Sequence, residues 1–163
     1  MPIAGIDQPA LIQVDENLRL RKYDGVHQFA FSWYQDEETV YMVDGRRAKY
    51  SMELLDSMYR YLDEQGELYF IEVLEAGVYR PIGDVTFWKD DMPIVIGEKK
   101  YRGRGLAQKV INALISRGKA LGYGCLFVRE IYSFNFASQH CFERAGFRMF
   151  EQTESGFRYQ LLL

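Results

Sequence analysis

The chain has few of the residues that would indicate a metal centre or a disulfide scaffold. Among its 163 residues are only two histidines and two cysteines, Cys125 and Cys141, with no CxxC or His/Cys cluster. A small disulfide-held protein or a zinc site would need more of these residues at closer spacing. We therefore expect no metal, and two free, buried thiols of the kind usual in a reducing cytoplasm.

Excess positive charge and long apolar runs are also absent. Lys and Arg number 20 against 23 Asp and Glu, so the net charge is −3 and no basic excess is available for nucleic acid. No apolar run approaches the roughly 20 residues that cross a membrane, and residues 1–7 lack the pattern of a signal peptide. With 48% hydrophobic residues, we expect one soluble cytoplasmic domain, residues 1–163, that binds neither nucleic acid nor membrane.

Hydrophobic periodicity and turn residues predict strands and helices in a mixed order. Residues 1–17 give no clear pattern. Strands are expected at 18–23, 68–73, 78–88, 93–97 and 125–131, with a terminal hairpin of 147–150 and 157–163. Helices are expected at 26–34, 36–44, 48–62, 106–121 and 135–146. This order predicts an α/β (mixed α+β) fold with one central, twisted, mixed sheet of six to seven strands flanked by helices.

One stretch, residues 93–121, combines a strand, a basic turn and the start of a helix. Residues 93–97 are apolar and β-branched, as in a strand buried on both faces. The turn Arg102-Gly103-Arg104-Gly105 puts two glycines where a backbone turns sharply or approaches a ligand closely. The helix from Leu106 adds free N–H groups and the positive end of its dipole. Together with Lys100, this predicts a phosphate or pyrophosphate site; a purely structural turn is the alternative.

Two blocks of the sequence resemble the GNAT superfamily of N-acetyltransferases. The run Lys100-Tyr101-Arg102-Gly103-Arg104-Gly105 resembles the family's pyrophosphate loop, Gln/Arg-x-x-Gly-x-Gly/Ala, although its first position departs from the pattern. Residues 135–147 look like the segment Asn-x-x-Ala/Ser … Tyr-Glu-Lys-x-Gly-Phe. Residues 33–38 and 94–99 further resemble the branch of ribosomal-protein N-terminal and polyamine acetyltransferases. The predicted order of strands and helices matches the GNAT fold over nearly the whole chain.

The resemblance implies that acetyl-CoA binds between the fourth and fifth strands of the fold, which family members splay apart. Backbone groups of Val95, Ile96 and Gly97 would pair with the pantetheine arm, and an N–H there would polarise the thioester carbonyl. Gly97 would lie at a bulge that opens the gap. The pyrophosphate would be held by Lys100, Arg102, Gly103, Arg104, Gly105 and Leu106. Asn135 would bind the pantetheine or only cap its helix.

Attack by an amine requires a base. An unperturbed amine has a pKa of about 10.4, so it is protonated at pH 7. The candidate bases are Asp84 on the third strand, and Asp36 or Glu37 in a loop over the acceptor site. The alternative for Asp84 is a strand residue facing solvent, and for the other two a solvated helix start.

The general acid is the weakest part of the resemblance. Most of the family places a tyrosine seven residues after the asparagine, and Phe142 stands there in this chain. Ser138, one helical turn earlier, could bond the leaving sulfur or could simply pack. Tyr132 is a weaker substitute. We take Ser138 and Asp84 as the candidate catalytic residues.

The acceptor is a primary amine that the sequence does not name. Trp33, Asp36 and Glu37 are expected to line its site, where acids facing the cleft would favour a cationic amine. A small amine, a polyamine, an aminoglycoside-like drug, an amino acid or a protein N-terminus all fit. The terminal strand Tyr159–Leu163 could also pair across a homodimer.

Three functions compete. The first is an acetyl-CoA-dependent N-acetyltransferase acting by direct attack of the amine. The second is a non-catalytic acyl-CoA-binding sensor or interaction module, which Phe142 and Lys100 favour. The third keeps the fold without the cofactor, and the intact Gly103-Arg104-Gly105 argues against it. Thiol release separates the first two functions, and stabilisation by CoA separates both from the third.

Overall fold

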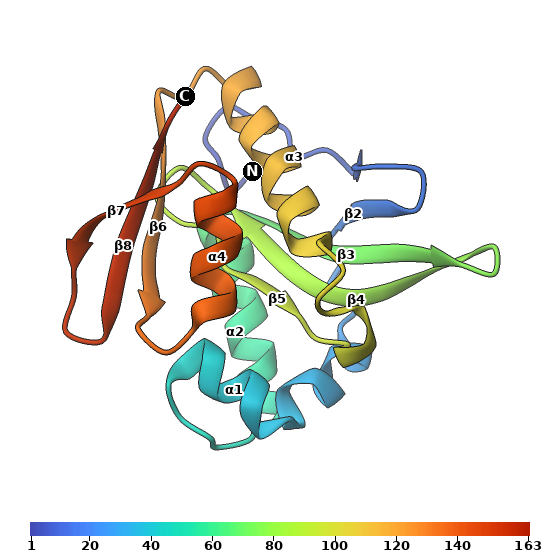
Figure 1. Ribbon diagram of the computed structural model, residues 1–163. Helices are drawn as coiled ribbons and strands as arrows, with labels where there is room; N and C mark the ends of the chain where they lie inside the picture. Colours follow the sequence, from blue (N-terminus) through green and yellow to red (C-terminus); the bar gives the residue numbers. More distant parts are fainter.

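The computed structural model describes residues 1–163, which form two antiparallel sheets with helices on both sides of the larger one (Figure 1). The larger sheet has the spatial order β1 (Leu11–Gln13), β2 (Leu18–Lys22), β3 (Glu67–Glu75), β4 (Val78–Phe87) and β5 (Ile94–Ile96). The smaller sheet has the order β6 (Cys125–Tyr132), β8 (Gly156–Leu162) and β7 (Arg148–Gln152). Strand β1 was not predicted, because it has only three residues and two of them are exposed.

The mixed α/β fold is confirmed, but its strands do not form one mixed sheet of six to seven strands. Strands β5 and β6 are not paired, and every ladder in the molecule is antiparallel. The ladder between β4 and β5 ends where the N–H groups of Gly97 and Glu98 both donate to the carbonyl of Ile82, at 2.7 and 3.0 Å. Two residues opposite one is the arrangement of a β-bulge, which turns the chain away before β6. The predicted bulge and splayed strands are therefore present.

Helices cover both faces of the larger sheet. One face is covered by the 3₁₀ helix η1 (Gln28–Gln35), α1 (Glu37–Asp44) and α2 (Met52–Gln65), and the other by η2 (Lys99–Tyr101), α3 (Leu106–Ala120) and α4 (Phe136–Arg144). Figure 1 shows α3 and α4 in front of the sheet and α2 behind it. None of the helices is long and apolar enough to cross a membrane.

Local capping explains where two of the helices begin. The helix predicted to begin at residue 48 begins four residues later, because the Ser51 hydroxyl accepts a hydrogen bond from the N–H of Leu54. Asp36 caps α1 in the same way through the N–H of Thr39. The predicted helix at residues 26–34 is a 3₁₀ helix.

Side-chain alternation along β3 creates two hydrophobic cores. Tyr69 and Ile71 face α3 and also join the core that reaches the smaller sheet. Leu68 and Phe70 face η1, α1 and α2. Because period-two alternation sends neighbouring residues to opposite faces, β3 is buried on both sides along most of its length.

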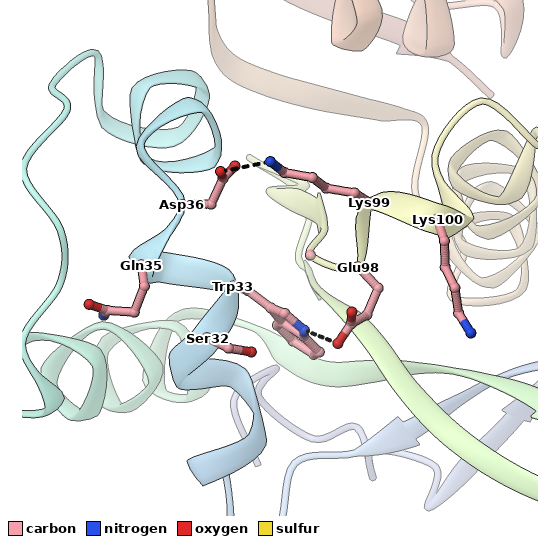
Figure 2. A pocket seen from close by; sticks show the side chains of 8 residues that line it. Ser32, Trp33, Gln35, Asp36, Glu98, Lys99 and Lys100 are labelled. Carbon is pink, nitrogen blue, oxygen red and sulfur yellow. Dashed lines mark hydrogen bonds and ion pairs between the residues drawn. The ribbon is translucent and has the colours of Figure 1, made fainter.

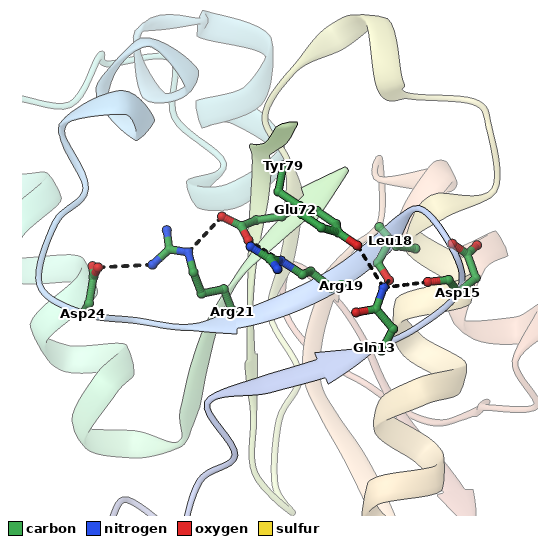
Figure 3. A network of polar contacts seen from close by, with 8 residues as sticks. All are labelled: Gln13, Asp15, Leu18, Arg19, Arg21, Asp24, Glu72 and Tyr79. Atoms are coloured by element: carbon green, nitrogen blue, oxygen red, sulfur yellow. Dashed lines mark hydrogen bonds and ion pairs between the residues drawn. The ribbon is translucent and has the colours of Figure 1, made fainter. Parts of the chain in front are cut away.

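Strands β2 and β3 are also joined by a charged network (Figure 3). Arg19 and Arg21 of β2 each donate from Nε to the carboxylate of Glu72, both at 2.8 Å. Glu72 is only 4% exposed, so the two guanidinium groups balance a buried charge. The guanidinium of Arg19 also lies 3.6 Å from the ring centroid of Tyr79 on β4. The network links the side chains of three neighbouring strands.

Two smaller expectations need correction. The segment predicted as a strand buried on both faces, residues 93–97, is mostly half-buried, because β6 does not cover its free edge. Strand β8 lies between β6 and β7, but β7 pairs only with residues 157–160 of it, so residues 161–163 have no partner on that side. The pairing of Tyr159–Leu163 across a dimer stays a prediction. Cys125 and Cys141 are free, as predicted, but half-buried.

Candidate active site

The free edge of β5 offers two backbone N–H groups, those of Ile94 and Ile96, toward the gap beside β6. The N–H of Thr86 donates to the carbonyl of Pro93, and the N–H of Gly97 donates to the carbonyl of Ile82. Val95 lies midway between Pro93 and Gly97, so it faces Asp84 and its backbone bonds to β4. By the alternation of an antiparallel ladder, the N–H of Ile96 points away from β4. Of the three residues predicted for the pantetheine arm, only Ile96 keeps a free N–H.

Gly97 is needed at the end of β5 because Trp33 packs beneath it. A Cβ at Gly97 would lie 2.2 Å from Cγ of Trp33, which no side chain tolerates. Trp33 is only 2% exposed, and its Nε1 donates to Oε1 of Glu98 at 2.9 Å. Trp33 therefore packs against the end of β5, and little of its side chain is exposed to an acceptor.

The turn before α3 has the shape of an anion cradle. Gly103 and Gly105 have φ angles of +73° and +76°, and a Cβ on either would meet no atom within 4 Å. Gly105 is the N-cap of α3 and supplies no side-chain cap, so the first N–H groups of the helix remain available. A pyrophosphate fits this combination of open space, free donors and helix dipole.

The basic side chains of the turn divide into two groups. Lys100 and Arg104 both lie over the Tyr101 ring, with Nζ and Cζ at 5.0 and 5.3 Å from its centroid. Arg102 instead donates to the carbonyl of Ile96 and to the hydroxyl of Thr39, both at 2.8 Å. Its guanidinium therefore joins β5 to α1, and only its backbone faces the turn. Leu106, the first residue of α3, is half-buried.

Asp84 is a buried carboxylate beside β5. It is 2% exposed, and the hydroxyls of Tyr34 and Tyr59 both donate to its Oδ2 at 2.8 Å. The alternative of a strand residue facing solvent is therefore wrong. Burial raises the pKa of Asp84 to about 6, although the two tyrosine hydroxyls lower it. A carboxylate with this pKa is ionised at pH 7 and can accept a proton.

A line of aromatic and polar groups leads from Asp84 toward the loop between α1 and α2. The ring of Tyr34 lies 5.0 Å from that of Tyr50, whose hydroxyl donates to Asp44 at 2.7 Å. At the next residue, a Cβ on Gly45 would lie 3.6 Å from Cζ of Tyr132. No sequence signal indicates this line, because its members come from separate segments of the chain.

At the start of α4, the two predicted residues are adjacent. Oδ1 of Asn135 accepts a hydrogen bond from the N–H of Ser138 at 3.2 Å, so the predicted cap is present and the amide NH₂ stays free. The Ser138 hydroxyl is half-buried and makes no hydrogen bond within the protein. Phe142 packs edge-on against Phe147 at 5.2 Å, inside the core. No acidic hydroxyl stands at that position.

Several of the predicted residues line one open pocket of about 540 Å³ (Figure 2). Its lining residues are Ser32, Trp33, Gln35, Asp36, Gly97, Glu98, Lys99 and Lys100. Asp36 forms an ion pair with Lys99 at 3.0 Å, and the hydrogen bonds from Lys99 and Thr39 lower its pKa to about 2. Such an acid is a poor proton acceptor. Glu37 is exposed on the first turn of α1 and is not part of the pocket.

Comparison with known proteins identifies the class of enzyme. The model of the acetyltransferase (GNAT) family matches residues 27–147, which is most of the chain. The chain belongs to this family. Acetyl-CoA-dependent N-acetyl transfer is therefore confirmed as its activity at the level of the family. No curated protein matches the sequence.

Solved structures share the fold at low sequence identity. A domain from Methanocaldococcus jannaschii DSM 2661 has a TM-score of 0.79 and 18% identity, over 91% of this chain and 100% of that chain. Spermidine N-acetyltransferase from Vibrio cholerae, in complex with CoA and spermine, has a TM-score of 0.72 and 18% identity, over 91% and 96%. RimL, a ribosomal L7/L12 alpha-N-protein acetyltransferase in complex with CoA, has a TM-score of 0.72 and 15% identity, over 94% of this chain and 98% of that chain.

Proposed function

We propose that this protein transfers an acetyl group from acetyl-CoA directly to a primary amine, in a single step at the gap between β5 and β6. The observation that carries the proposal is the buried carboxylate of Asp84, held by two tyrosines on the strand next to the free N–H of Ile96. The acceptor is a small amine, a polyamine or a protein N-terminus. We further propose that residues 1–163 act as one acetyltransferase domain in the cytoplasm.

The residues of the basic turn would hold the cosubstrate. Lys100, Arg104 and the backbone of residues 102–106 would bind the pyrophosphate, and the free amide NH₂ of Asn135 would bind the pantetheine. When bound, acetyl-CoA supplies an acetyl group activated as a thioester. The N–H of Ile96 would donate to the thioester carbonyl, and an N–H aimed at developing negative charge accelerates acyl transfer. Val95 and Gly97 would act by keeping Ile96 in register with β4.

Asp84 would act as the general base, directly or through a water. With a pKa of about 6 it is mostly ionised at pH 7, and the hydroxyls of Tyr34 and Tyr59 stabilise the anion. Of the other two candidates, Asp36 forms an ion pair with Lys99, and Glu37 is exposed to solvent. The amine would therefore lose its proton to Asp84.

Ser138 would assist the departure of the thiolate. Its hydroxyl is free of internal hydrogen bonds and lies on the first turn of α4, where the positive end of the helix dipole also stabilises negative charge. Phe142 offers no proton. Because a thiolate is a good leaving group with a reference pKa of about 8.5, the help needed from a donor is modest.

The acceptor would enter where the α1–α2 loop meets the end of β6. We place this mouth where Gly45 lies against Tyr132, because Asp44, Tyr50 and Tyr34 connect that point, contact by contact, with Asp84.

A thermal-shift titration with acetyl-CoA, compared with free CoA, tests binding. At a free concentration of about a hundred times Kd, we expect a stabilisation of about 2.7 kcal/mol. Thiol release with a panel of amines then tests turnover. Binding without turnover on any amine would favour the alternative, an acyl-CoA sensor, and no shift with either ligand would remove the cosubstrate from the proposal.

A further inference from the structure

The loop between α1 and α2 carries three positive charges without internal partners. Arg46, Arg47 and Lys49 are exposed, and none of them takes part in an ion pair. The adjacent acid, Asp44, accepts the hydrogen bond of Tyr50 and keeps its negative charge, because the tyrosine hydroxyl is neutral. Residues 44–49 therefore carry a net charge of +2, three basic side chains against one acid, in a chain with a net charge of −3.

Aromatic rings hold this basic loop in place. The guanidinium carbon of Arg47 lies 4.3 Å from the ring centroid of Tyr41. Tyr41 stacks on Phe134 at 4.2 Å and 15°, and Phe134 stacks on Tyr132 at 5.3 Å and 9°. Arg47 thus ends a column of three rings that reaches from α1 to the end of β6. The column holds Arg47, one of the three charges, in place.

That place is the mouth proposed for the acceptor. Gly45, the residue before the basic loop, contacts Tyr132, and Phe134 is followed directly by Asn135 at the start of α4. Asp36 and Glu37, which were expected to select a cationic amine, are not close to this loop. Asp36 and Glu37 lie at the opposite end of α1, an eight-residue helix about 12 Å long. Asp36 is also neutralised by Lys99.

We infer that the acceptor carries a carboxylate or phosphate close to its amine, and that Arg46, Arg47 and Lys49 bind this anionic group. The inference rests on the proposed acetyl transfer and names its substrate class. Guanidinium groups suit the task because their planar donors match carboxylate and phosphate oxygens. The anionic group has two possible sources, a peptide with acidic residues after its N-terminus or a small amine such as an aminoalkyl phosphate.

The test compares acceptors of opposite charge. We would measure kcat/KM by thiol release for an N-terminal peptide followed by Asp and Glu, the same peptide with Lys, 2-aminoethyl phosphate and 1,4-diaminobutane. We expect the anionic member of at least one pair to be preferred, with a preference that weakens as salt is added. The pair that shows the larger preference identifies the source. Preference for both cationic acceptors would overturn the inference.

A matched pair of variants assigns the preference to the loop. In Arg46→Gln/Arg47→Gln/Lys49→Gln, kcat/KM for the anionic acceptor should fall about tenfold or more, mainly through KM. The control, Arg80→Gln/Lys89→Gln/Arg148→Gln, removes the same charge from exposed residues that also form no ion pair. Its kcat/KM should not change. Equal losses in both variants would refute a role for the loop.

Binding separates a failure of this inference from a failure of the proposed function. If no amine is acetylated, the proposed transfer is wrong, and the anisotropy of a fluorescent acidic peptide still decides the inference. Weaker binding of that peptide to the loop variant than to the control variant would support it. Equal binding of acidic and basic peptides to the wild-type protein would contradict it.

Discussion

The chemistry of Asp84 depends on the side chains that surround it. In solution an aspartate is a weak base, with an ordinary pKa of 3.8, but burial raises the pKa of Asp84 to about 6 against the opposite effect of the two tyrosine hydroxyls. A higher pKa increases the proton affinity of the carboxylate while leaving it ionised at neutral pH. Neither property can be assigned from an isolated Asp on a predicted strand.

Replacing Asp84 with asparagine should abolish the base without removing a hydrogen-bond acceptor for Tyr34 and Tyr59. We expect kcat to fall about 100-fold or more, with the Kd for acetyl-CoA unchanged. In the wild-type protein kcat/KM should rise with pH around a midpoint of about 6, the pKa of Asp84, and this step should vanish in the variant. Asp90→Asn, on an exposed loop residue, is the control. A variant that keeps the step would exclude Asp84 as the base.

The same pKa gives a prediction for stability. Because the pKa of Asp84 is higher in the folded than in the unfolded protein, its contribution is fully present below pH 4 and is lost as pH rises through 6. The loss is on the order of 3 kcal/mol. Urea unfolding at pH 4.5 and 7 should therefore show Asp84→Asn gaining stability relative to wild type at the higher pH. A constant difference between the two proteins would contradict the raised pKa.

Ser138 can be tested by separating turnover from binding. We expect Ser138→Ala to lower kcat about tenfold, because the leaving sulfur loses its donor, and to leave the Kd for acetyl-CoA within error. Ser155→Ala, in the turn between β7 and β8, should change neither. Should kcat be unaltered in Ser138→Ala, the hydroxyl serves only for packing.

Helix α3 is flanked by two glycines, one before its first turn and one after its last, and both have a left-handed backbone conformation. Gly105 precedes the helix with φ of +76°, and Gly122 follows it with φ of +81°. A Cβ at either would meet nothing within 4 Å. The backbone strain caused by alanine is thus similar at both ends, about 1 to 2 kcal/mol, while only Gly105 adjoins the proposed pyrophosphate.

We therefore expect Gly105→Ala to weaken acetyl-CoA binding about tenfold or more, because its methyl group would enter the space of the phosphates. Gly122→Ala should lose similar stability and keep full affinity. Isothermal titration with acetyl-CoA and urea unfolding measure the two effects. Equal affinities would show that the turn before α3 is only a structural connection.

Across the molecule, a buried ion pair joins the larger sheet to the end of α3. Glu67 at the start of β3 is fully buried and accepts hydrogen bonds from Nε and Nη2 of Arg117 at 2.5 and 2.6 Å. The hydroxyl of Tyr69 also donates to Glu67, at 2.9 Å. Since a buried carboxylate without its cation is costly, this contact anchors the helix whose other end carries the proposed cosubstrate turn.

Replacing Arg117 with methionine should cost about 3 to 5 kcal/mol of unfolding free energy, because Glu67 would be left as an uncompensated buried charge. Lys109→Met on the same helix breaks an exposed ion pair with Asp15 and should cost less than about 1 kcal/mol. The double variant Glu67→Gln/Arg117→Met should recover part of the loss. Urea unfolding of the three variants measures these changes in unfolding free energy. Similar losses of unfolding free energy for Arg117→Met and Lys109→Met would exclude a buried pair.

Much of the fold could be predicted from local signals. The helix from Leu106, the cap at Asn135, the terminal hairpin and the positions of β2 to β6 all follow from periodicity and capping residues. The separation of the strands into two sheets could not be predicted, because strand pairing depends on contacts between distant segments. The short β1 and the 3₁₀ form of η1 also gave no periodic signal.

The sequence by itself determined the class of protein, because the basic turn and the Asn135 block are contiguous segments that resemble motifs of the family. Only the tertiary structure decided which residues act together. It buried Asp84 between Tyr34 and Tyr59, drew Arg102 away from the basic turn and set the α1–α2 loop against Tyr132. These arrangements join segments far apart in the chain, and a pKa or a binding surface arises only once packing has removed water and set the distances.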